Sequence, residues 1–386
     1  MIPSTTPLGE RIARQIAATG PIGIAEYMAL CMNDPVDGYY ARPDTIGARG
    51  DFITAPETSQ MFGELIGVWC VSAWQALGRP AECRLVEAGP GRGTLLRDLL
   101  RAVHRFAEFD AAIDLRLVET SAAMIAHQHQ AIEAAGLHFA GKATWHTSLA
   151  EVPAGPLILV ANEFLDVLPF RQYVKAGEVW HERCVGFGED GSLRFALGPA
   201  LIDPSLLPPG APSEPDGAVY EYAPAREAWV AALAERLARD GGVALLIDYG
   251  HAESGFGDTF QAMRGHGYAD PLESPGLADL TSHVDFAALS RAAMAAGAHA
   301  SVITEQGEFL LSMGLLERAG ALGAKGDEET RQRLRGEVER LAHHNHMGRL
   351  FKVLALSGGM LVNGQGSNTL GFPPFSALAG SDVKES

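Results

Sequence analysis

The chain has 386 residues, enough for two or three domains or for one fold with insertions at about 150 residues per domain. Its 47% of hydrophobic and 20% of charged residues are typical of a globular protein and exclude a disordered chain, a collagen and a coiled coil. With 30 basic and 47 acidic residues the net charge is −17, which argues against binding to nucleic acid. An acidic surface is compatible with a basic protein partner.

The cysteines and the apolar segments concern the cellular compartment. The 4 cysteines form no CxxC pair, so the sequence predicts free buried thiols and no zinc ribbon. The longest apolar run, residues 65–77, is interrupted by polar side chains and is too short to span a membrane. The N-terminus has no apolar segment like that of a secretory signal. We therefore expect a cytoplasmic protein with no membrane insertion.

The first 80 residues predict a helical segment. Apolar residues spaced four apart within residues 8–33 indicate two helices separated by a break at Gly20-Pro21. A polar loop is expected over residues 41–51. A long helix follows over residues 57–77, with its apolar side chains on one face. We expect residues 1–80 to form a cap on a domain that comprises residues 81–386.

From residue 84 onward, short apolar runs alternate with helical segments. This alternation predicts an α/β fold with a mostly parallel sheet that helices cover on both faces. Alternating residues and turns within 170–218 predict inserted β-hairpins, and a second insertion is expected near 250–345, beginning with a long loop over residues 250–276. The expected strands are residues 84–89, 115–119, 143–145, 157–161 and 242–247, with closing strands near 301–304 and 350–356.

A glycine-rich turn joins the first of these strands to a helix. Its sequence is Glu87-Ala-Gly89-Pro90-Gly91-Arg-Gly93-Thr. Glycine allows a sharp turn and a close approach of a ligand to the backbone, and the free N–H groups of the following helix favour an anionic group. The carboxyl edge of the sheet is where doubly wound folds bind their ligands. We therefore expect a nucleoside cofactor here.

Two acidic residues indicate which cofactor this is. Glu87 would repel a pyrophosphate but suits an ammonium group, and the spacing G-x-G-x-G differs from the dinucleotide motif G-x-G-x-x-G. Glu119 ends the next strand, where a carboxylate accepts hydrogen bonds from ribose hydroxyls. S-adenosylmethionine (SAM) has one ribose, one amino acid and no phosphate, so it fits better than NAD. An NAD-dependent oxidoreductase remains an alternative.

Several segments, in order along nearly the whole chain, resemble the MidA-like family. This resemblance implies a Rossmann-like, SAM-dependent methyltransferase, and for mitochondrial members methylation of an arginine on a respiratory complex I subunit. It also implies that Glu87, Gly89, Gly91 and Gly93 bind the cofactor and that Glu119 binds its ribose. Leu165 and Val167 replace the Phe and Ala of the family pattern. The resembling segments are residues 50–57, 60–64, 87–94, 161–166, 246–250, 279–286 and 347–352.

Polar residues follow the strand at 157–161, whose end faces the transferable methyl group in this fold. Glu163 and Asp166 would pair with an arginine guanidinium, which stays protonated, and leave one of its nitrogens able to attack. Asn162 would hold the cofactor amino group. The alternative is that Asn162 and Asp166 cap a turn and that Glu163 is a solvated loop residue.

The remaining candidate residues carry weaker signals. Thr54 either caps the long helix in a capping box with Glu57 or contacts the cofactor from a lid. Ser148 and Leu149 follow the third strand, where the adenine would lie. The run His343-His344-Asn345-His346 has no acid or thiol at ligand spacing, so we expect no metal. A non-catalytic assembly factor that retains the SAM fold is a further alternative to an enzyme.

Overall fold

The computed structural model describes residues 6–41, 54–135 and 138–359. Two compact units make up the chain. We call one the sheet unit (Thr54–Glu163, Val230–Ala252 and Ser290–Ser386) and the other the hairpin unit (Met1–Ile53, Phe164–Trp229 and Glu253–Leu289). Residues 42–51 of the predicted polar loop lie outside the described residues, as do residues 50–53 of the resembling segment. The cap over residues 1–80 remains a prediction.

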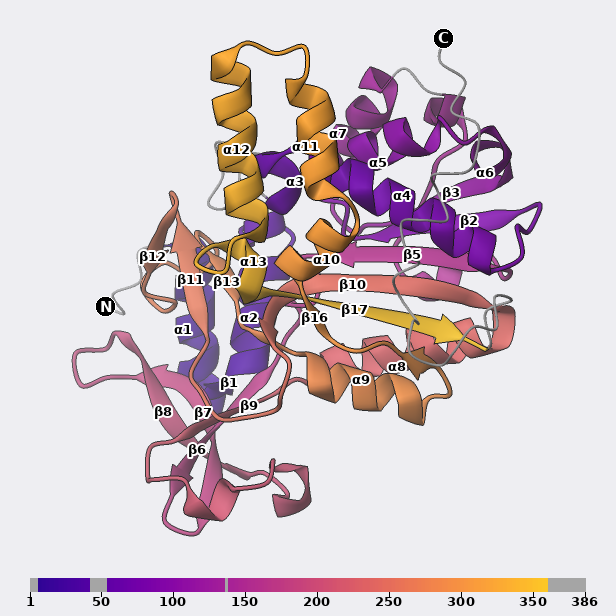
Figure 1. Cartoon of the computed structure of the whole chain (residues 1–386). Coiled ribbons are helices and arrows are strands. Elements are labelled where there is room, and N and C mark those ends of the chain that lie inside the picture. Colours follow the sequence, from indigo (N-terminus) through magenta and orange to yellow (C-terminus); the bar gives the residue numbers. More distant parts are fainter. Residues whose placement is uncertain (1–5, 42–53, 136–137, 360–386) are drawn as a thin grey trace. The chain divides into compact units, whose positions relative to one another are not determined.

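A mixed sheet forms the core of the sheet unit (Figure 1), and it confirms the predicted α/β fold. The neighbouring pairs β10–β5, β5–β2, β2–β3 and β3–β4 are parallel, whereas β17 pairs antiparallel with β10, β15 and β16. Strand β5 is apolar and buried from Leu157 to Ala161, as expected for a strand covered on both faces. In sheet order the strands are β15 (His299–Ala300), β17 (Phe351–Gly358), β10 (Gly242–His251), β5 (Leu157–Asn162), β2 (Cys83–Ala88), β3 (Ile113–Val118) and β4 (Thr144–His146), with β16 (Thr304–Glu305) beside β17.

Helices that alternate with these strands pack on the sheet. Helices α4 and α5 approach closely, because an added Cβ at Gly63 would meet Asp98 Cβ at 2.8 Å and one at Gly67 would meet Leu99 O at 2.8 Å. Their buried side chains join those of the sheet in one apolar cluster. The helices between the first strands are α3 (Ala55–Thr58), α4 (Gln60–Ala76), α5 (Thr94–Val103), α6 (Ala107–Ala112) and α7 (Ala122–Ala134), with the short 3-10 helices η2 (His138–Gly141) and η3 (Leu149–Glu151).

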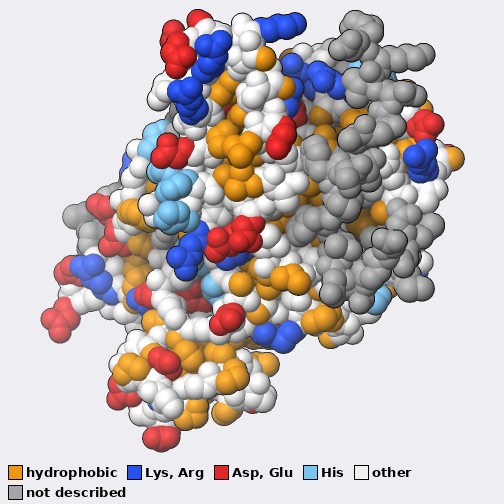
Figure 2. Space-filling view, in the orientation of Figure 1, with side chains coloured by type: hydrophobic (Ala, Val, Ile, Leu, Met, Phe, Trp, Pro, Cys, Tyr) orange, Lys and Arg blue, Asp and Glu red, His pale blue; other side chains and the backbone are white. Residues whose placement is uncertain are grey.

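Helices near the C-terminus of the sheet unit enclose an apolar groove. Leu311 and Leu316 line this groove and are 44% and 57% exposed. The groove has a volume of about 670 Å³, and its apolar side chains are visible between α11 and α12 in Figure 2. These helices are α10 (Gln306–Ser312), α11 (Leu315–Gly323), α12 (Glu328–Ala342) and α13 (Met347–Leu350).

The hairpin unit contains two antiparallel sheets and two N-terminal helices. The predicted insertion at residues 170–218 forms hairpins, as expected, and helices α1 (Pro7–Thr19) and α2 (Ile24–Asn33) confirm the break at Gly20-Pro21. The larger sheet has the order β1 (Ile22–Gly23), β7 (Val179–Phe187), β6 (Arg171–Ala176) and β9 (Val219–Tyr222), with β8 (Leu193–Leu201) paired to β7. The 3-10 helices of this unit are η1 (Tyr39–Ala41), η4 (Pro204–Leu206) and η5 (Ala211–Ser213).

The expectation of a long loop over residues 250–276 is only partly right, because a short hairpin interrupts it. Strand β11 (Gln261–Arg264) pairs antiparallel with β12 (Gly267–Ala269) and with β13 (Asp279–Thr281). The turn between β11 and β12 uses Gly265 and His266, both with positive φ. Strand β11 has only four residues, so its alternation of apolar and polar side chains is too short to be recognised as a strand among the surrounding glycines and polar residues. One of its partners, β13, lies outside the predicted loop.

Helices α8 (Pro224–Asp240) and α9 (Phe286–Ala295) each contain residues of both units, and β14 comprises Val284–Asp285. All four cysteines are free and buried, as predicted. Within the described part of the chain, no helix combines the length and the apolar character needed to cross a membrane.

Candidate functional site

The glycine turn between β2 and α5 has the left-handed backbone that its sequence predicts. The φ angles of Gly89, Gly91 and Gly93 are 65°, 53° and 79°, a region that other residues rarely adopt. The Gly93 N–H donates to Pro90 O at 2.8 Å and closes the turn. Gly93 is the N-cap of α5 and has no side chain to occupy the first N–H groups of that helix. These N–H groups are therefore available to a carboxylate.

Glu87 lies at the end of β2 and is only 4% exposed. Its Oε2 atom is buried and has no hydrogen-bond partner among the described residues. Burial raises the pKa of Glu87 to about 8, because removing the carboxylate from water penalises its charged form. A buried carboxylate with an open acceptor suits a cationic ligand, which supplies the missing donor and the opposite charge.

Asn162 offers a second buried acceptor, at the end of β5. Its Oδ1 atom has no hydrogen-bond partner within the described ranges, whereas its Nδ2 donates to Glu163 Oε1 at 3.1 Å. Strands β2 and β5 are adjacent and parallel, so Glu87 and Asn162 lie at the same carboxyl edge of the sheet. Both orphaned oxygens fit the ammonium group of a bound SAM.

Glu119 follows β3 and is held close to the glycine turn. Its Oε1 accepts hydrogen bonds from the N–H groups of Thr120 and Ser121, both at 2.8 Å. Its Oε2 accepts from Gln128 Nε2 at 3.0 Å. Burial raises the pKa of Glu119, and these donors oppose that effect. The carboxylate is therefore fixed in position beside the turn rather than directed away from it.

Gln128 connects these parts and was missed by the sequence analysis. This fully buried residue of α7 donates from Nε2 to Gly91 O at 2.8 Å as well as to Glu119. Its Oε1 accepts from Trp145 Nε1 at 2.7 Å. One side chain thus joins the glycine turn, the predicted ribose carboxylate and β4. No pattern in the sequence indicates this role, because a glutamine inside a helix is ordinarily a surface residue.

The strand-end residue Glu163 has an unusual backbone. Its φ is 51°, in the left-handed region that a residue with a Cβ enters at a cost of about 1–3 kcal/mol. Its N–H donates to Ile247 O at 2.9 Å, and its Oε1 accepts from Ala55 N, at the start of α3, at 3.4 Å. Neighbouring strands thus hold the residue in a strained conformation, a feature that clusters at functional sites.

Asp166 is buried, at 4% exposure, and belongs to the hairpin unit, whereas Glu163 belongs to the sheet unit. Its backbone carbonyl accepts hydrogen bonds from Arg226 Nη2 at 2.8 Å and from Ser282 N at 3.3 Å. Arg226 is itself 1% exposed and also donates to Leu168 O and His283 O. This buried guanidinium fixes the backbone that carries Asp166. No pattern in the sequence predicts this role of Arg226.

The three weaker candidates, Thr54, Ser148 and Leu149, lie at the starts of the short helices α3 and η3. Thr54 is the N-cap of the short helix α3 and makes no side-chain cap hydrogen bond. The proposed capping box for the long helix is therefore wrong. Ser59 has an extended backbone, separates α3 from the long helix α4, and is itself the N-cap of α4. Ser148 precedes η3. Leu149 is buried, and its carbonyl oxygen accepts a hydrogen bond from Arg236 Nη1 at 2.8 Å. Contact of these residues with a cofactor remains a prediction.

The family follows from comparison with known proteins. Residues 65–304 match the model of a family described as "Putative S-adenosyl-L-methionine-dependent methyltransferase". The chain belongs to this family, so it is a SAM-dependent methyltransferase, and an NAD-dependent oxidoreductase is excluded.

Relatives and solved structures cover almost the whole chain. A Drosophila melanogaster protein named "Protein arginine methyltransferase NDUFAF7 homolog, mitochondrial" is 38% identical over 92% of this chain and 86% of its own length. The Mus musculus protein of corresponding name is 37% identical over 91% and 84%. A crystal structure from Burkholderia thailandensis, solved with S-adenosyl-homocysteine bound, is 29% identical, has a TM-score of 0.81, and covers 93% of this chain and 96% of that one.

These relatives contradict the expected cytoplasmic location, because their names place them in mitochondria. The expectation rested on the unpaired cysteines, on the lack of an apolar run long enough to span a membrane and on the lack of a recognised secretory signal, and none of these properties specifies a compartment.

Proposed function

We propose that this protein transfers a methyl group to a guanidinium nitrogen of an arginine in a protein substrate. The strained, carboxylate-bearing Glu163 at the carboxyl edge of the sheet is the observation that carries the proposal. The relatives from fly and mouse are named protein arginine methyltransferases, which supports the same substrate class. The net charge of −17 is favourable for a basic substrate.

The buried acceptors of the sheet unit fit the cofactor. Glu87 Oε2 and Asn162 Oδ1 are proposed to accept from its ammonium group, and the first N–H groups of α5 to bind its carboxylate. Glu119 is proposed to accept from the ribose hydroxyls through the lone pairs that Gln128 leaves open. When bound, SAM supplies a methyl group that its sulfonium has already activated.

Glu163 is proposed to act on the substrate. A guanidinium remains protonated at neutral pH, so its nitrogen lone pairs are delocalised and attack poorly. A carboxylate that pairs with two of its N–H groups localises positive charge on that side and orients the third nitrogen. The hydrogen bonds from Asn162 and Ala55 fix Glu163 Oε1, so its orientation does not depend on the substrate. Asp166 is proposed as a second carboxylate.

The experiment is methyl transfer by the Glu163→Gln variant. Purified protein is incubated with radiolabelled SAM and an extract from cells that lack this protein, and the acceptors are then hydrolysed to amino acids. We expect labelled methylarginine with the wild type and with the exposed control Glu133→Gln, but a loss of about 100-fold or more with Glu163→Gln. Calorimetry should show SAM affinity within about threefold in all three proteins.

Other outcomes contradict the proposal in distinct ways. Label on lysine or on a small molecule refutes the substrate class. Loss of both SAM binding and transfer in Glu163→Gln assigns the residue to the cofactor site. SAM binding without transfer by the wild type to any acceptor supports a non-catalytic assembly factor. A respiratory complex I subunit, the substrate that the family resemblance implies for mitochondrial members, is the first acceptor to test.

A further inference from the structure

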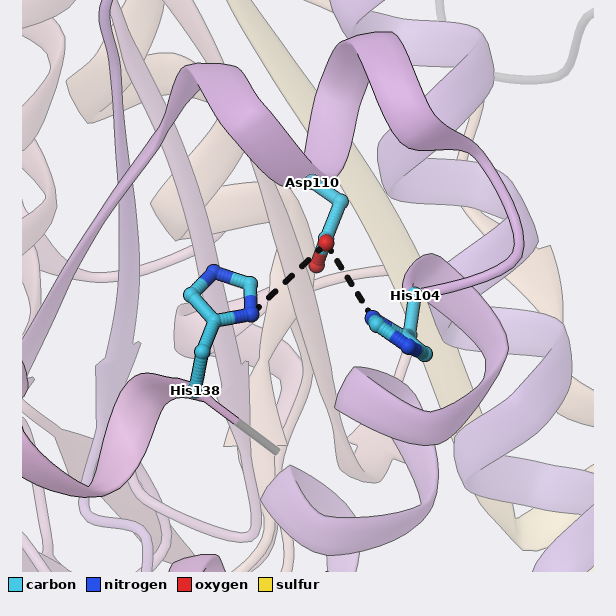
Figure 3. Close-up of side chains that lie close together, drawn as sticks. All are labelled: His104, Asp110 and His138. Carbon is cyan, nitrogen blue, oxygen red and sulfur yellow. Dashed lines mark hydrogen bonds and ion pairs between the residues drawn. The ribbon is translucent and has the colours of Figure 1, made fainter. Parts of the chain in front are cut away.

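Two imidazoles and a carboxylate converge in the sheet unit, away from the glycine turn (Figure 3). His104 follows α5, Asp110 lies in α6 and His138 begins η2. Asp110 Oδ2 lies 3.1 Å from His104 Nδ1 and 3.7 Å from His138 Nδ1. One ligand atom from each of the three residues lies within 4.8 Å of the other two. Residues separated along the chain thus direct nitrogen and oxygen atoms at one point.

These separations match those between the ligands of one metal ion. Zinc binds imidazole nitrogen and carboxylate oxygen at about 2.0–2.2 Å, so two ligands of a tetrahedral ion are roughly 3.3–3.6 Å apart. The observed 3.1 and 3.7 Å lie on either side of this range. The two imidazoles also lie within 4.8 Å of each other, and because both are exposed they can rotate to place all three atoms around an ion.

The backbone beneath each ligand is anchored in the apolar core. His104 follows Val103, which is 0% exposed. Asp110 follows Phe109, also 0% exposed, and His138 precedes Phe139, which is 1% exposed. Each ligand is thus attached to a residue that holds its position through packing. A site on such rigid supports loses little conformational entropy when it binds an ion.

The carboxylate of Asp110 has one hydrogen-bond partner among the described residues, His104 Nδ1 at 3.1 Å from its Oδ2. Its Oδ1 is buried without a hydrogen-bond partner among the residues that the structure describes. Within the described residues its Oδ2 forms ion pairs with the two imidazoles, and these attract a carboxylate electrostatically only when they are protonated. A divalent cation would neutralise the carboxylate while the imidazoles remain neutral.

We propose that His104, Asp110 and His138 form a zinc-class metal site, with water completing the coordination. Two imidazoles and one carboxylate suit Zn²⁺, whereas Ca²⁺ and Mg²⁺ prefer oxygen ligands throughout. The 10 residues of α5 separate His104 from the glycine turn by about 15 Å, so the ion cannot reach the cofactor loop. An ion bound there would connect the end of α5 to α6 and to η2.

The test is a titration of chelator-treated, full-length protein with zinc chloride, followed by calorimetry. We expect one site in the wild type, and at least about tenfold weaker binding in His138→Gln and in Asp110→Asn. The matched control is His344→Gln, in the exposed histidine run at 343–346, and it should bind zinc like the wild type. Calcium chloride should give no binding heat.

A second measurement separates the site from the proposed enzyme function. Zinc should raise the melting temperature of the wild type and of His344→Gln but not that of His138→Gln. SAM affinity should agree within about twofold with and without zinc. Equal zinc affinity in wild type and His138→Gln, or a loss confined to His344→Gln, overturns the proposal. So does the absence of zinc binding by the wild type.

Discussion

The pH dependence of SAM binding follows from the buried carboxylate of Glu87. With a pKa of about 8, the carboxylate is ionised in about 1% of molecules at pH 6 and about 9% at pH 7. The SAM amino group stays protonated over this interval. If the ammonium binds only the ionised form, the affinity should therefore rise about ninefold between pH 6 and pH 7. The same residue makes binding release nearly one proton.

The stability of the cofactor-free protein should change in the opposite direction. Glu87 has a higher pKa in the folded protein than its ordinary value of 4.5, so the folded state holds the proton more tightly. Its contribution to the free energy of unfolding is complete below pH 4.5 and is lost as the pH rises through about 8. Between pH 6 and 7 this loss is about 1 kcal/mol.

The assays are calorimetric titration with SAM and urea unfolding, each at several pH values in buffers of different ionisation enthalpy. Glu87→Gln should bind SAM weakly and should lack both pH dependences, whereas Glu119→Gln should keep the dependence that Glu87 causes. A SAM affinity that does not change between pH 6 and 7 in the wild type would refute the reasoning. So would a Glu87→Gln variant whose SAM affinity and free energy of unfolding change with pH as they do in the wild type.

Three other substitutions test the packing around the site. Gln128→Leu should weaken SAM binding about tenfold by calorimetry, because it removes a hydrogen bond to a charged group, whereas the exposed Gln130→Leu on the same helix should not. Gly93→Ala should lower the free energy of unfolding in urea by more than Gly91→Ala, since both incur about 1–2 kcal/mol of left-handed strain but only the former places a Cβ 2.9 Å from that of Ala131. Arg226→Met should lower it by about 3 kcal/mol or more because several buried carbonyls lose their donor; a loss below about 1 kcal/mol would contradict that role.

Much of the sheet unit could be predicted because its signals are local. Strands β5 and β10 are continuous apolar runs, and each lies within a few residues of its predicted position. The glycine turn requires a left-handed backbone at fixed positions, and the glycines in the sequence indicate these positions directly. The family resemblance extended these observations to cofactor and reaction.

The features that escaped prediction depend on tertiary contacts. Gln128 and Arg226 act through buried hydrogen bonds to distant residues, which no spacing within the sequence reveals. The convergence of His104 and His138 on Asp110 joins segments up to 34 residues apart. The left-handed φ of Glu163 is equally hidden, because a glutamate in a sequence does not indicate positive φ.

The left-handed backbone at Glu163 has a consequence for natural variation among homologous proteins. Glycine adopts this conformation without the steric penalty of a Cβ, so Glu163→Gly would relieve strain while removing the carboxylate. Selection for folding alone would favour glycine at this position, and the proposed role of the carboxylate in methyl transfer would oppose it. A homologue with glycine there is therefore a candidate pseudoenzyme, recognisable from a single codon.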